Sequence, residues 1–91
     1  MNTTTTAPLA VGTVIEMDKE GAYCTETGAK VVHTWTTKNT VTAVDGVGFT
    51  YKVTEVVAEA NRPEFAGTPT GGTMAWFALP LYIARGTLRI V

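Results

Sequence analysis

Apolar and polar positions alternate along much of the chain, most cleanly over residues 48–58. The apolar positions on one face of this stretch are Phe49, Tyr51, Val53 and Val57. A period of two predicts a half-buried antiparallel strand. No helical period of useful length appears, so the only helical element expected is one turn at 81–84. Further strands are expected where short apolar runs lie between turn residues, at 10–17, 22–26, 29–36, 40–44, 73–79 and 87–91.

Turn residues separate these runs. Polar clusters at 18–21 and 37–39 predict breaks between strands, and three dipeptides that contain glycine predict tight turns. These dipeptides are Thr27-Gly28, Asp45-Gly46 and Arg85-Gly86. The longest irregular stretch, residues 59–72, holds two prolines and three glycines and predicts a functional or mobile loop.

Composition favours a sheet. The chain of 91 residues has 18 threonines, 11 valines and 3 isoleucines, and such β-branched side chains pack well on a pleated surface. Short strands joined by turns make a sandwich or a small barrel. We predict an all-β fold, a small antiparallel β-barrel of five or six strands. Residues 1–8 are expected to form a flexible tail and residues 9–91 a single domain.

The last part of the chain resembles the closing unit of Src-homology-three-type barrels. It has an apolar strand at 73–79, then Pro80, a short turn that carries Tyr82, and a final strand at 87–91. The resemblance covers about 19 residues and implies the barrel architecture alone. The acidic, aromatic loop and the second tryptophan with which those domains bind proline-rich peptides are not recognisable in this sequence.

Charge and cysteine content exclude several function classes. The net charge is −1 and charged residues make up 16% of the chain, which argues against nucleic-acid binding and leaves little barrier to self-association. The single cysteine, Cys24, allows no intrachain disulfide. The sequence shows no signal peptide and no membrane span, so the expected location is cytoplasmic. No cofactor is expected.

The stretch from Lys30 to Asn39 holds the only histidine, His33. A two-residue turn at Thr27-Gly28 would place Ala22 opposite His33 and Cys24 opposite Val31. Cys24 and His33 would then be diagonal neighbours, the one weak candidate for an enzymatic pair. No orienting group or oxyanion donor can be placed beside them, so we expect no enzyme. One His and one Cys also fall short of a zinc site.

The same register predicts that Val31, His33 and Trp35 share a face that points into the core, together with Ala22 and Cys24. His33 would then be a buried or rim histidine bonded to backbone. The Gly-rich segment 67–72 lacks the Lys-Ser or Lys-Thr pair of a phosphate loop. Three alternating carboxylates are expected to form a solvated strand end, namely Glu16, Asp18 and Glu20.

Apolar residues on both faces of several strands predict a covered surface. Trp76 and Phe77 are adjacent and point to opposite faces if they lie in a strand, and Val56-Val57 and Val31-Val32 raise the same question. In the 59–72 loop, Phe65 either anchors the loop on the core or is offered to a partner. The expected binding residues are Phe65, Trp76, Phe77 and Tyr82, with Arg85 and Arg89 as a polar rim.

The leading interpretation is a non-enzymatic binding or assembly module that acts by protein–protein interaction. Its partner would be another protein or a further copy of itself, as in the small accessory or inhibitor proteins that bacteriophages encode. The alternative is a β-barrel that binds a small ligand or nucleotide. In that case His33, Trp35 and Tyr51 or Tyr82 would stack on a planar group, and Arg85 or Arg89 would meet an anion. A barrel that binds oligonucleotides is disfavoured by the charge.

Overall fold

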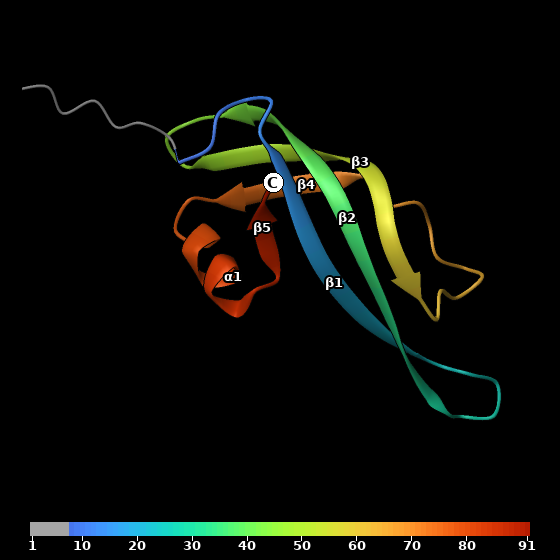
Figure 1. Ribbon diagram of the computed structural model, residues 1–91. Coiled ribbons are helices and arrows are strands. Elements are labelled where there is room, and N and C mark those ends of the chain that lie inside the picture. Colours follow the sequence, from blue (N-terminus) through green and yellow to red (C-terminus); the bar gives the residue numbers. More distant parts are fainter. Residues whose placement is uncertain (1–7) are drawn as a thin grey trace, which may run out of the picture.

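A computed structural model describes residues 8–91, so the tail predicted over residues 1–8 lies outside the described residues except for Pro8. The strands form one antiparallel sheet in the order β4-β3-β2-β1-β5, with a short helix before the last strand (Figure 1). The elements are β1 (Val14–Cys24), β2 (Lys30–Val44), β3 (Gly48–Ala60), β4 (Gly71–Ala75), α1 (Leu79–Arg85) and β5 (Leu88–Ile90). The predicted all-β class is confirmed.

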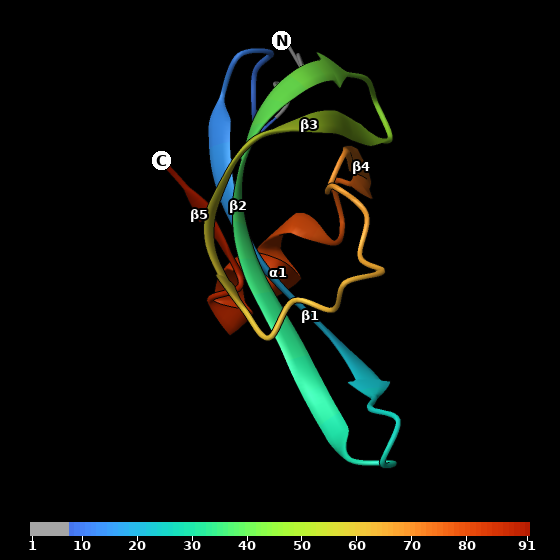
Figure 2. The same cartoon turned by 90° about the vertical axis from the view of Figure 1, so that its right-hand side faces the viewer.

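The sheet curls but does not close, so the predicted barrel and the architecture implied by the resemblance are not confirmed. Within residues 8–91, the outer edges of β4 and β5 have no strand partner. The pairing of β2 with β3 shifts register at three places, after Thr36, Lys38 and Val41. Such bulges bend a strand and increase its twist, which gives the sheet the curved shape seen edge-on in Figure 2.

Two predicted breaks are wrong, because residues 18–21 and 37–39 lie inside long strands. β1 and β2 pair without interruption from Val14↔Thr40 to Cys24↔Lys30. The 18–21 cluster fits because alternate side chains point to opposite faces of a strand. Asp18 and Glu20 point to the solvated face. In the 37–39 cluster Thr37 and Asn39 are buried, and the Asn39 amide donates to the Thr37 hydroxyl. The backbone N–H and C=O groups of both segments form hydrogen bonds between β1 and β2, so no turn is needed to pair them.

The hairpin between β1 and β2 turns over three residues instead of two. The Thr25 amide donates to the Ala29 carbonyl oxygen at 2.9 Å, and Gly28 sits in the left-handed region with φ of 83°. This is the usual three-residue hairpin loop, in which glycine occupies the left-handed position. The register therefore differs by one from the prediction: His33 faces Gly21, and Ala22 faces Val32.

The core lies on one face of the curled sheet, which we call the inner face. Leu9 also belongs to the core, because residues 9–13 form a bend and turn that leads into β1 instead of the start of a strand at residue 10. The buried apolar side chains are Leu9, Ile15, Met17, Val41, Phe49, Tyr51, Leu79 and Leu88. Phe49 is central to the aromatic part of the core, with ring centroids 5.9 Å from Tyr51 and 5.1 Å from Trp76.

The C-terminal unit differs from the predicted strand at 73–79. β4 ends at Ala75, and a turn over residues 76–78 leads directly into α1. Pro80 lies in the first turn of the helix, where its missing N–H costs nothing, rather than ending a strand. Gly86 ends the helix with φ of 77°, and its N–H bonds back to the helix carbonyls. Within residues 8–91 no helix is long and apolar enough to cross a membrane.

Candidate functional site

Several large apolar side chains on α1 and in the turn before it are exposed to solvent. Phe77 is 80% exposed and Leu81 is 55% exposed, whereas Leu79 is the helix's only buried side chain. Because successive helical positions turn by about 100°, Leu81 lies roughly 200° around the helix from Leu79 and points away from the core. Tyr82 and Ile83 are also substantially exposed. We call these four residues, Phe77, Leu81, Tyr82 and Ile83, the α1 surface.

The remaining predicted binding residues near α1 divide between the core and this surface. Trp76 is partly buried and packs against the core: its ring contacts Phe49, and its indole N–H donates to the Asp45 carbonyl oxygen at 2.6 Å. Arg85 stays beside the α1 surface, with its guanidinium 5.8 Å from the centroid of the Tyr82 ring. The expected pair of opposite strand faces at Trp76-Phe77 is therefore wrong, since the two residues lie in a turn.

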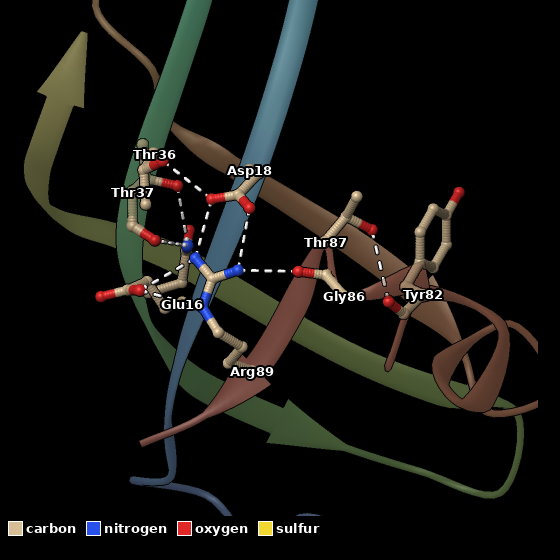
Figure 3. A network of polar contacts seen from close by, with 9 residues as sticks. Glu16, Asp18, Thr36, Thr37, Tyr82, Gly86, Thr87 and Arg89 are labelled. Carbon is tan, nitrogen blue, oxygen red and sulfur yellow. Dashed lines mark hydrogen bonds and ion pairs between the residues drawn. The ribbon is translucent and has the colours of Figure 1, made fainter. Parts of the chain in front are cut away.

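Arg89 holds two carboxylates on the outer face of the sheet (Figure 3). Its guanidinium donates to Glu16 Oε1 at 2.9 and 3.0 Å and to the two oxygens of Asp18 at 2.7 and 2.8 Å. The Thr36 hydroxyl donates to Asp18 at 2.8 Å. The carboxylates of Glu16 and Asp18 are thus paired with Arg89 and not simply solvated. Arg89 does not border the predicted aromatic binding residues. The network ties β5 to β1 and β2.

These contacts shift the ionisation of the network. The hydrogen bonds from Arg89, and then that from Thr36, lower the pKa of Asp18 from the usual 3.8 to about 2. The carboxylates raise the pKa of Arg89. A bidentate arrangement of this kind favours the charged form of both partners. We infer a structural role for this network, because its four side chains bond to one another. They are Glu16, Asp18, Thr36 and Arg89.

Asp18 is expected to make the fold sensitive to acid. A pKa that is lower in the folded than in the unfolded chain adds stability above the unfolded value of 3.8, and this is lost as the pH falls to about 2. Asp18→Asn should therefore lower the unfolding midpoint at neutral pH and flatten its fall in acid. Thermal unfolding of both proteins as a function of pH measures this. Glu26→Gln, in the exposed hairpin loop, should leave the wild-type profile unchanged; identical profiles for wild type and Asp18→Asn would contradict the assignment.

The inner face of the β1–β2 hairpin carries a second polar cluster. The His33 and Trp35 rings stack with centroids 4.4 Å apart. His33 Nε2 donates to Glu59 Oε2 at 2.7 Å, and the Arg62 guanidinium donates to the same oxygen at 3.3 Å. The bond from His33, followed by the contact with Arg62, lowers the pKa of Glu59. His33 is buried as predicted, but its partner is a carboxylate rather than the backbone.

Cys24 and His33 do not form the predicted pair. In the observed register Cys24 faces Lys30 and His33 faces Gly21, so the two side chains point to opposite faces of the hairpin. Cys24 is exposed on the outer face. In the part of the chain that the structure covers, no group of three or more His, Cys, Asp or Glu side chains is placed to hold a metal ion.

The predicted loop is shorter than expected, spanning residues 61–70, and it is fastened to the hairpin. The Tyr23 hydroxyl donates to the Asn61 carbonyl oxygen, and the Asn61 amide donates to the Val32 carbonyl oxygen, both at 3.0 Å. Phe65 meets Tyr23 edge-on with centroids 5.8 Å apart, yet it is 78% exposed. Pro63 is the buried residue of the loop. Phe65 is therefore no core anchor.

An open cavity of about 170 Å³ lies on the inner face between the sheet and the end of this loop. Trp35 and Tyr51, two of the three residues of the predicted ligand platform, line it, whereas His33 does not. Lys19 and the buried Asn39 also line it, and sequence reasoning missed both. The strict alternation through β1 and β2 places both on the inner face, but the predicted breaks at 18–21 and 37–39 hid that signal. Comparisons of the chain with protein-family models, curated proteins and solved structures find no match.

Proposed function

We propose that this protein is a non-catalytic binding module that assembles through the α1 surface, and that its partner there is a second copy of the same chain. The observation that carries the proposal is that α1 buries only Leu79 while it and the preceding turn expose four large apolar side chains. Several large apolar side chains exposed on one short element are typical of an interaction site.

The neighbouring strand supports self-assembly in particular. β5 follows α1 directly, its outer edge is free within residues 8–91, and it exposes Ile90. A free edge presents unpaired N–H and C=O groups that an identical edge can pair with in an antiparallel fashion about a two-fold axis. Such an arrangement would bring two α1 surfaces to the same side of the joined sheets.

Charge also favours contact between identical copies. The chain carries a net charge of −1, so two copies repel each other weakly. Arg85 at the border of the α1 surface packs over Tyr82 and leaves the exposed Phe77 and Leu81 unobstructed. Aromatic side chains and arginine are the types that are enriched at the centre of protein interfaces.

A double substitution tests the proposal. The wild-type mass from light scattering should rise with concentration from 9.7 kDa toward twice that value. Phe77→Ser combined with Leu81→Ser removes the most exposed apolar groups of the surface, so this variant should stay monomeric while keeping the wild-type circular dichroism spectrum. Val47→Ser provides the matched control, because Val47 is 75% exposed but lies in the β2–β3 turn. The Val47→Ser protein should assemble as the wild type does. A wild-type chain that is monomeric at every concentration would refute the proposal.

A further inference from the structure

The hydroxyl of Tyr51 is a polar group without a partner in the fold. Tyr51 is only 8% exposed, and its hydroxyl forms no hydrogen bond within residues 8–91. In this range the one fully buried side-chain oxygen or nitrogen without a partner is Asn39 Oδ1, so the Tyr51 hydroxyl itself keeps accessible surface. A hydroxyl at the accessible end of an otherwise buried ring can bond to a bound molecule while the core stays as it is.

The Tyr51 hydroxyl lies beside the start of β4. Tyr51 is paired with Gly72, and a Cβ added at Gly72 would lie 3.3 Å from the hydroxyl oxygen. Glycine at this position therefore leaves the hydroxyl uncrowded. The 170 Å³ cavity on the inner face is lined by Tyr51 and, at the same end of β4, by Thr70 and Gly71. The hydroxyl thus borders this cavity.

The other walls of the cavity are suited to a planar apolar group. Trp35 supplies an aromatic wall, and Val53 and Pro69 supply aliphatic ones. His33 stacks on the Trp35 ring with centroids 4.4 Å apart, which holds the indole in place. A cavity of roughly 150 Å³ holds one benzene ring. Walls of this kind favour a ligand with a single aromatic ring.

Lys19 adds an unpaired cation to the same cavity. It lies directly opposite Trp35 in the pairing of β1 with β2, and no carboxylate of residues 8–91 forms an ion pair with it. Glu59, the neighbour of Trp35 on the other side, is already paired with His33 and Arg62. An ammonium and a hydroxyl both donate, and a carboxylate offers two oxygens that only accept. The polar groups therefore fit a carboxylate.

We propose that the inner face binds a small aromatic carboxylate with a single ring, of the benzoate class. The ring lies in the cavity against Trp35, Val53 and Pro69. One carboxylate oxygen accepts the Tyr51 hydroxyl, and the other pairs with the Lys19 ammonium. No residue that lines this cavity belongs to the α1 surface, so the site goes beyond assembly and does not depend on it.

Titration of the labelled full chain with benzoate, followed by NMR, tests the proposal. The indole N–H signal of Trp35 should shift and saturate with one site per chain, whereas that of Trp76, which does not line the cavity, should stay fixed. Benzamide keeps the ring without the charge and acetate keeps the charge without the ring, so both should bind at least fivefold more weakly. A fixed Trp35 signal, or equal binding of benzamide or acetate, would overturn the proposal.

Two variants test the two polar contacts. Tyr51→Phe removes the hydroxyl alone, and a hydrogen bond to a charged group is strong enough that benzoate should bind about tenfold more weakly. Lys19→Met keeps the aliphatic stem and should weaken benzoate about threefold, as expected for an exposed ion pair. Lys52→Met is the matched control, because Lys52 is exposed on the outer face of β3, and it should bind benzoate as wild type.

The free protein provides a further check on Tyr51. Because its hydroxyl has no partner in the fold, Tyr51→Phe should keep the thermal midpoint of the wild type. A large fall in that midpoint would show that the hydroxyl is bonded within the protein, which would overturn the proposal. So would unchanged benzoate binding in Tyr51→Phe or in Lys19→Met. None of these results would bear on the α1 surface, because the mass measurement on Phe77→Ser with Leu81→Ser reports on separate residues.

Discussion

Replacing Phe49 by alanine should cost about 4 kcal/mol of unfolding free energy. Phe49 is 3% exposed and joins the two other large rings of the core, Tyr51 and Trp76. Its truncation leaves a cavity between β3, which supplies Phe49 and Tyr51, and the turn after β4, which supplies Trp76. A chain of this size has a total stability of about 5–15 kcal/mol, so the loss would be a large fraction of it.

The same substitution at Phe65 provides the control. Phe65 is 78% exposed and touches Tyr23 through one edge-to-face contact, which is worth about 1 kcal/mol. Urea denaturation followed by circular dichroism measures both variants. A similar loss in the two would mean that Phe49 is not at the centre of the core.

Replacing Gly71 by alanine should destabilise the fold by about 4 kcal/mol, because two costs combine. Gly71 begins β4 with φ of 117°, a conformation that side chains with a Cβ rarely adopt. An added Cβ would also overlap the carbonyl oxygen of Tyr51 on the neighbouring strand and lie 2.8 Å from the Cα of Lys52. β4 would have to shift away from β3, and with it the turn that places Trp76.

Gly67→Ala is the matched control for this change. Gly67 lies in the 61–70 loop, and an added Cβ would meet no atom within 4 Å. Its unfolding free energy should stay within about 0.5 kcal/mol of the wild type. Equal denaturation midpoints for Gly71→Ala and Gly67→Ala would show that β4 is not packed against β3 as closely as the structure has it.

The sequence predicted the sheet well where alternation and turn chemistry act together. The strand expected over 48–58 corresponds to β3, and the Asp45-Gly46 turn precedes it. Asp45 holds this turn by accepting the amides of Val47 and Gly48 at 2.8 and 2.9 Å. Gly86 ends α1 as its position after Arg85 suggested. At these places the local preference and the tertiary structure agree.

The prediction was wrong where polar clusters lie inside long strands. The segments 18–21 and 37–39 have the composition of turns, but each pairs with the other hairpin strand. The stabilisation from continuous pairing between the two strands outweighs the local preference of these residues for turns. The single-residue error in the hairpin register has a similar origin, because a two-residue and a three-residue loop both fit the Thr-Gly pair. A shift of one residue moves Cys24 to the other face.

The binding roles of the candidate site residues stay predictions, but the structure places these residues. Phe77 and Tyr82 are exposed, and Trp35 and Tyr51 line one cavity. The link between Arg89 and the carboxylates of β1 depends on β5 pairing with β1, which joins residues more than 70 positions apart. No local pattern signals such a contact. Asn39 appeared to be a turn residue, so its burial could not be read from its neighbours.

The most direct test of the account is a concentration series of amide NMR spectra of the labelled wild-type chain. Assembly through the α1 surface predicts that amides of Phe77–Ile83 and of β5 shift and broaden as the concentration rises, and that those of the 26–28 hairpin loop stay fixed. Spectra that are unchanged over the whole series would contradict the account. So would shifts confined to the β1–β2 hairpin.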